Sequence, residues 1–109
     1  MTEIKYDAST IGELMNQCGG FFNAMGDDVR RGLFLKMVNA GDKGINVTNL
    51  TADTGLSRPA ISHHLKVLKK NGLVKLRREG RNNFYYVDLN ENLEHLKQFV
   101  TCADSIIKK

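Results

Sequence analysis

VTNLTADTGLSRPAISHHLKVL, residues 47–68, has the pattern of two short helices joined by a tight turn. Gly55 can adopt the left-handed backbone conformation that such a turn requires. Ser57 can cap the second helix, and Pro59 falls in its first turn, where a missing N–H costs little. The second helix has an apolar stripe at helical spacing, formed by Ile61, Leu65 and Leu68. Residues 47–70 therefore have the pattern of a helix-turn-helix, a motif that places its second helix in the major groove of DNA.

The remaining face of this second helix presents cations and hydrogen-bond donors. Helix-turn-helix proteins set the N-terminal part of that helix against base edges, so such a face predicts contact with DNA. A solvated face without any partner is the competing explanation, because charged residues on an amphipathic helix usually only meet water. The candidate DNA-binding residues here are Ser57, Arg58, Pro59, Ser62, His63, Lys66 and Lys70.

The next stretch, LVKLRREGRNNFYYVD at residues 73–88, has the pattern of a β-hairpin. Apolar and basic residues alternate in its first half, turn-forming residues occupy 79–82, and aromatic residues follow. A hairpin directly after a recognition helix is a wing, and cations near its tip can meet phosphates or enter a minor groove. The candidate DNA-binding residues of the wing are Arg77, Arg78, Arg81 and Asn82.

Positive charge is concentrated on these two motifs. Residues 57–82 contain eight basic residues and one acidic residue, whereas the rest of the chain contains eight basic and eleven acidic residues. A basic patch confined to the segment that is expected to touch DNA is the electrostatic pattern of a nucleic-acid-binding protein.

Apolar residues at helical spacing predict three further helices, at 8–25, from a cap at Asp27 to about Ala40, and at 91–107. The middle helix is expected to bury Val29, Leu33, Phe34, Met37 and Val38 and to expose Arg30, Arg31 and Lys36. The predicted fold is a mainly helical α+β winged helix. It has five helices and a two-stranded wing in the order ααααββα, within a single domain over residues 1–109.

The helices at 8–25 and 91–107 carry more apolar surface than a winged helix needs for itself. This surplus predicts that they are dimerisation helices, which pair with their copies in a second chain. The alternative is that they simply close the core of the monomer.

The sequence resembles the ArsR/SmtB family of bacterial winged-helix repressors over roughly residues 21–87. The resemblance rests on three blocks: FFNAMGDDVRRGLFLKM, LSRPAISHHLKVLKKNGLV and RREGRNNFYYV. It implies a homodimeric repressor whose partner is a double-stranded DNA operator, an inverted repeat, with release by an inducer that the sequence does not identify.

The metal sites of that family are not expected in this chain. A Cys-x-Cys pair found in metal-sensing relatives aligns with Asn46 and Thr48, which cannot supply a thiolate. The zinc site of the last helix would fall on Asn90, Asn92, Ala103 and Ile106. His95 stands alone, and the adjacent His63 and His64 point about 100° apart on a helix, so they do not converge on one ion. We therefore predict no metal site and no cofactor.

Cys18 and Cys102 fall on the first and last predicted helices. If these helices meet, the two thiols could act as a redox switch, which would make the protein a thiol-responsive repressor. Buried cysteines that act as small hydrophobes are the alternative.

Several other classes of protein are disfavoured by what the sequence lacks. It has no nucleophile–base constellation and no phosphate-cradling loop after a strand, so we predict no catalytic residue and no enzyme. It has no apolar run long enough for a membrane span, and its first ten residues do not resemble a signal peptide, so a cytoplasmic location without a membrane partner is expected. A winged-helix module that binds protein is the remaining alternative.

Overall fold

A computed structural model describes residues 8–108 of the chain. The elements are α1 (Ala8–Met25), α2 (Asp28–Ala40), the short 3-10 helix η1 (Gly41–Lys43), α3 (Val47–Thr51), α4 (Arg58–Lys70), β1 (Val74–Glu79), β2 (Asn82–Val87) and α5 (Asn90–Ile107). The predicted order of five α-helices and one hairpin is confirmed within this part of the chain; η1 was not predicted. Most of the stretch used for the signal-peptide expectation, residues 1–7, lies outside the described part.

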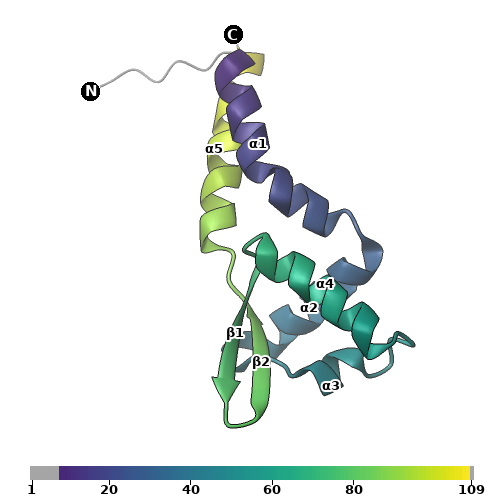
Figure 1. Ribbon diagram of the computed structural model, residues 1–109. Helices are drawn as coiled ribbons and strands as arrows, with labels where there is room; N and C mark the ends of the chain where they lie inside the picture. Colours follow the sequence, from purple (N-terminus) through teal and green to yellow (C-terminus); the bar gives the residue numbers. More distant parts are fainter. Residues whose placement is uncertain (1–7, 109) are drawn as a thin grey trace.

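The molecule has two parts along its length of 52 Å. Figure 1 shows α1 and α5 side by side at one end and the tip of the hairpin at the other. The helices α2, α3 and α4 gather between these ends, beside the hairpin. None of the helices within residues 8–108 is both long enough and apolar enough to cross a membrane.

Local capping explains where the central helices begin. Asp27 Oδ1 accepts a hydrogen bond of 3.0 Å from the backbone N–H of Arg30, which satisfies a free donor of α2 and lowers the pKa of the Asp27 carboxyl. Ser57 Oγ accepts from the N–H of Ala60 at 3.2 Å and caps α4 in the same way. The turn before α4 contains Gly55 with a φ of 71°, so the predicted cap at Asp27, the cap at Ser57 and the glycine turn are all confirmed.

The main core lies under α4 and is closed by α2, α3 and β1. Its buried side chains are Ala24, Leu33, Met37, Leu50, Ile61, Leu65, Leu68, Leu73 and Val74. The stripe predicted for α4 is therefore confirmed. The larger apolar face predicted for α2 is wrong in part, because Val29 is 38% exposed and Val38 is 47% exposed. Neighbours on a helix point about 100° apart, so Val38 turns away from the core that Met37 enters.

Among the cations of α2, Arg31 is exposed as predicted, but Arg30 and Lys36 are half-buried, contrary to expectation. Lys36 Nζ donates to the carbonyl oxygens of Leu50, at 3.3 Å, and Ala52, at 2.8 Å. A cation at these positions satisfies carbonyls at the C-terminal end of α3 and interacts favourably with its dipole. Lys36 therefore holds the first helix of the helix-turn-helix against α2.

The hairpin pairs Val74 with Val87 at its base and Glu79 with Asn82 at its tip. Its two-residue loop contains Gly80 with a φ of 59°, a conformation suited to the first position of a type II′ turn. Ile45 and Tyr85 exchange backbone hydrogen bonds of 2.9 Å in both directions, which fixes β2 to the segment before α3.

Candidate nucleic-acid interface

The solvent-facing side of α4 collects every candidate DNA-binding residue that the sequence placed on this helix and its cap. All seven are exposed: Ser57, Arg58, Pro59, Ser62, His63, Lys66 and Lys70. Pro59, His63, Lys66 and Lys70 lie on the side of α4 away from the buried stripe of Ile61, Leu65 and Leu68, Ser62 lies at the flank, and Ser57 and Arg58 lie at the N-terminal end of the helix. Because packing of the buried stripe fixes the rotation of α4 about its axis, these polar side chains all remain exposed to solvent.

The first turn of α4 is linked to α3 through Arg58. One terminal nitrogen of its guanidinium, Nη2, donates to Thr48 Oγ1 at 3.1 Å. A guanidinium has five N–H donors, and this bond orients the group while using one of them. The interaction makes Arg58 the side chain that bridges both helices of the helix-turn-helix on their exposed side.

His63 and His64 have different surroundings. His63 is exposed, whereas His64 is half-buried, with its Nδ1 at 3.3 Å from Arg30 Nη1. An arginine can only donate, so Nδ1 of His64 is the acceptor in this contact. Arg30 also donates from Nε to the carbonyl of Ala24 at 2.9 Å, so the pair connects α4 to the end of α1.

The arginines of the wing lie in two different places. Arg78, Arg81 and Asn82 are exposed at or beside the turn, where the sequence placed them. Arg77 was expected near the tip, but it pairs with Phe84 two positions further down the ladder. The sequence could not show this difference, because the residues that hold Arg77 come from another part of the chain.

Arg77 fastens the wing to η1. Its Nη1 donates to the carbonyl of Asp42 at 3.0 Å, and its Nη2 donates to the carbonyl of Lys43. Its Nε pairs with Glu79 at 3.1 Å, and its guanidinium carbon lies 5.6 Å from the centre of the Phe84 ring. Because all three of its side-chain nitrogens have partners within the protein, the main role of Arg77 is to anchor the wing.

A polar cleft of about 570 Å³, which the sequence did not predict, lies between the wing, η1, α3 and the C-terminal part of α2. Lys43 and Asn49 are exposed on its walls, and Arg77 and Phe84 form its wing side. The weak signal in the sequence was a lysine between two glycines, Gly41 and Gly44. The cleft adds a cation and an amide next to the elements that carry the predicted DNA contacts.

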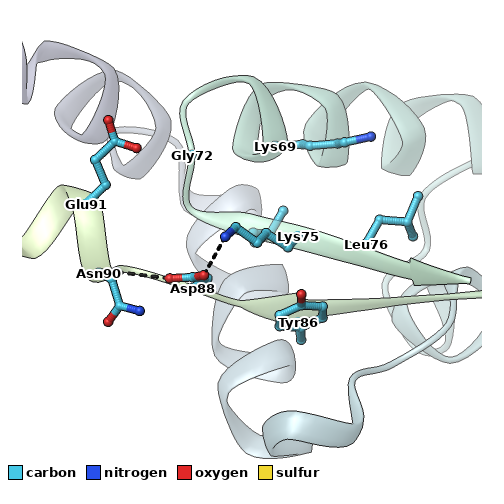
Figure 2. Close-up of a pocket in the computed structure, with 9 residues that line it drawn as sticks. Lys69, Gly72, Lys75, Leu76, Tyr86, Asp88, Asn90 and Glu91 are labelled. Carbon is cyan, nitrogen blue, oxygen red and sulfur yellow. Dashed lines mark hydrogen bonds and ion pairs between the residues drawn. The ribbon is translucent and has the colours of Figure 1, made fainter.

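A second cleft, also of about 570 Å³, lies where α4, the base of the hairpin and α5 meet. Figure 2 shows Asp88 between Lys75 and the start of α5: Oδ2 lies 2.8 Å from Lys75 Nζ, and Oδ1 accepts from the N–H of Asn90 at 3.1 Å. The hydrogen bond with Lys75 lowers the pKa of Asp88 and raises that of Lys75. Since the charges of Asp88 and Lys75 neutralise each other, the role of these contacts is to join β1 to the start of α5.

Asn46 and Thr48, which align with the Cys-x-Cys pair of metal-sensing relatives, have other partners. Asn46 Oδ1 accepts from the N–H of Asn49 at 2.8 Å and caps α3, and Thr48 accepts from Arg58. No cluster of three potential ligands for a metal ion occurs within residues 8–108. Both cysteines are buried, and desolvation raises the pKa of the Cys18 thiol.

An exposed polar recognition helix next to a hairpin wing defines the chain as a winged-helix DNA-binding protein. A family model described as bacterial regulatory protein, arsR family, matches residues 35–75. The HTH-type transcriptional regulator MJ1325 of Methanocaldococcus jannaschii is 39% identical over 75 residues, which cover 69% of this chain and 82% of that protein. The chain belongs to the ArsR family of transcriptional regulators.

Two further comparisons agree with this assignment. The putative arsenical resistance operon repressor ArsR2 of Halobacterium salinarum is 41% identical over 63 residues, which cover 58% of this chain and 52% of that repressor. The chain thus spans about half the length of this relative. The ArsR-like transcriptional regulator from Rhodococcus sp. RHA1 has the same fold, with a TM-score of 0.72, 22% identity and coverage of 85% of each chain. The family consists of transcriptional regulators, so the protein is a DNA-binding regulator and not an enzyme.

Proposed function

We propose that the protein is a homodimeric cytoplasmic repressor in which each chain binds one half of an inverted-repeat operator. The observation that carries this proposal is the shared exposure of the polar face of α4 and of the wing cations Arg78 and Arg81. A helix and a wing presented together can contact a groove and the adjoining backbone of the same duplex.

Within this interface we assign different tasks to the two ends of α4. Ser57, Arg58 and Ser62 occupy the N-terminal half, the part that meets base edges in helix-turn-helix complexes. Lys66 and Lys70 follow toward the C-terminal end and suit phosphates, because a lysine acts as a point charge. The wing residues Arg78, Arg81 and Asn82 would contact the backbone or a minor groove.

Dimerisation through α1 and α5 is supported by apolar side chains that their mutual packing leaves uncovered. The exposed ones are Met15, Phe22, Leu93, Val100 and Ile107. The rings of Phe22 and Phe99 meet edge to face at 6.4 Å, so aromatic surface of both helices belongs to one patch. Exposed patches of this kind mark interaction sites, and a second copy of the same chain offers a self-complementary cover.

The deciding experiment measures DNA binding against salt concentration. An operator is first selected in vitro with the purified protein, and its affinity is then measured by fluorescence anisotropy between 50 and 200 mM salt. If about six phosphates are neutralised per dimer, the affinity falls by about 10³-fold over this range. Failure to enrich any duplex, or a fall of less than about threefold, would overturn the proposal and favour a protein-interaction module.

We also propose that release of DNA does not depend on a soft metal ion bound at the start of α3. Asn46 and Thr48 offer no thiolate, and their side chains are already hydrogen-bonded within the helix-turn-helix. Cadmium or zinc added at a modest excess should leave operator affinity unchanged. Metal-dependent release that persists when Asn46 is replaced by alanine would point to another site.

A thiol-responsive repressor is the second candidate function. It is favoured by position, because Cys18 and Cys102 lie on α1 and α5, which pack against each other. It is opposed by burial, because the thiolate is the reactive form and desolvation disfavours it at Cys18. Release of the operator by oxidant in the wild type, but not in Cys102→Ser, would support this function.

A further inference from the structure

A buried amide joins α5 to the end of the recognition helix. Asn92, in the first turn of α5, is 7% exposed, and it is the only buried polar side chain among residues 8–108. Its Nδ2 donates to the carbonyl oxygens of Asn71, at 3.3 Å, and Gly72, at 3.0 Å. Asn71 is the C-terminal cap of α4, so one side chain of α5 satisfies both carbonyls of the turn that ends this helix.

The same turn also contacts α1. A Cβ atom at Gly20 would lie 2.7 Å from Asn71 Oδ1, closer than such atoms approach in proteins. The Asn71 side chain is itself fixed, since its Nδ2 donates to the carbonyl of Val67 at 2.9 Å. Because Gly20 has no side chain, α1 can approach this turn closely. The turn therefore contacts both α1 and α5, the helices of the proposed dimer interface.

A third contact holds the start of α5 to the hairpin. Asp88 bonds both to Lys75 of β1 and to the N–H of Asn90, as Figure 2 shows. We call the contacts of Gly20, Asn71, Gly72, Asp88 and Asn92 the junction. It connects the helices that would form the dimer with the helix and wing that would bind DNA.

We infer that Asn92 is a positioning residue that sets the separation of the two recognition helices in the dimer, and with it the spacing of operator half-sites. The inference rests on the proposed function. A planar amide that donates to two adjacent carbonyls fixes both distance and orientation, whereas a shorter side chain would leave those carbonyls unsatisfied. A change of angle at the junction would displace the N-terminal end of α4 most, because the end proposed to contact bases is the one opposite the turn that Asn92 holds.

The assay uses a series of operators whose half-sites are moved apart or together by one base pair. Each step changes their separation by about 3.4 Å and their relative rotation by about 35°. We expect the wild type to prefer one spacing by at least about tenfold, comparable to a mismatched base pair. In Asn92→Ala the preference for one spacing should fall below about threefold, or the preferred spacing should change, because the two recognition helices are no longer held at one separation.

Asn90→Ala is the matched control, because it removes the same type of side chain from an exposed position in the same turn of α5. It should keep the wild-type preference. Gly20→Ala is an independent second variant that disturbs the Asn71 side chain from α1 and should also weaken the preference. Thermal unfolding and molecular mass establish that each variant is a folded dimer, and Gly20→Ala decides the matter if Asn92→Ala does not fold.

The outcomes separate the inference from the proposed function. A wild type that binds no duplex overturns both. If the wild type selects one spacing and folded Asn92→Ala and Gly20→Ala retain its full preference, the inference alone is wrong. A uniform loss of affinity at every spacing also contradicts it, because general destabilisation lowers all affinities together and leaves their ratios unchanged.

Discussion

Arg77 and Arg81 are both arginines of the wing, but their surroundings predict opposite consequences of substitution. Arg77 donates to two backbone carbonyls, pairs with Glu79 and lies over Phe84, whereas Arg81 is exposed in the turn. Replacing Arg77 by alanine should therefore lower stability, and replacing Arg81 should mainly lower the electrostatic part of DNA binding.

The magnitude for Arg77→Ala follows from the contacts. A hydrogen bond contributes a net ~1 kcal/mol, an exposed ion pair less than ~1 kcal/mol, and a partly exposed cation–π contact ~0.5 kcal/mol. The side chain is 38% exposed, so solvent competes for each contact, and we expect a total loss of about 1–2 kcal/mol. For a domain of this size, that corresponds to a fall in Tm of about 4–10 °C.

The assay combines thermal unfolding, followed by circular dichroism, with the salt dependence of operator binding. Arg81→Ala should leave Tm unchanged and reduce the salt slope by about one phosphate contact per chain. Arg77→Lys is the control that retains charge, because a lysine cannot reproduce the planar fork of the guanidinium. It should lose stability like Arg77→Ala. An unchanged Tm in Arg77→Ala together with a reduced salt slope would show that Arg77 contacts DNA and is not an anchor.

Three further outcomes are expected. Arg58→Ala should lose about 1–3 kcal/mol of discrimination between operator and random duplex, and equal losses on both in a competition assay would refute base reading by Arg58. Val100→Glu should shift the protein toward monomer in analytical ultracentrifugation, because a charge would replace an exposed apolar side chain of α5; an unchanged dimer would mean that the interface lies elsewhere. The lowered pKa of Asp88 means that its ion pair stabilises the folded state above the usual aspartate pKa and loses this effect as the pH falls through the lowered value. The difference in free energy of unfolding between wild type and Asp88→Asn should thus shrink below about pH 4, as urea titrations at several pH values can test.

Features that depend on neighbours in the sequence could be predicted well. The caps at Asp27 and Ser57, the turn at Gly55 and the hairpin around Gly80 all follow from the side chains or backbone freedom of a few adjacent residues. The exposed face of α4 followed from its periodicity, since the apolar stripe leaves the opposite side to solvent.

Features that depend on distant contacts could not be predicted. The two carbonyls that bind Arg77 lie 34 and 35 residues earlier in the chain, so its alternation with apolar residues indicated only a strand. Asn92 reaches a turn 20 residues away, and the resemblance drew attention to its position only as a missing zinc ligand. The hydrogen bonds from Lys36 to two carbonyls at the C-terminal end of α3 likewise depend on how α2 and α3 pack, which the sequence does not show.

The buried cysteines are separate from the cluster of apolar side chains beneath α4. Within residues 8–108, the buried apolar side chains therefore divide between the cluster inside the winged helix and the two cysteines on the packed helices α1 and α5. Proteins open in cooperative units that follow such divisions. Amide protons along the outer turns of α1 and α5 should exchange with solvent through partial opening, while those of α4 and β1 exchange through global unfolding. In the proposed dimer, a subunit would then be able to separate from its partner while its DNA-binding half keeps its native fold.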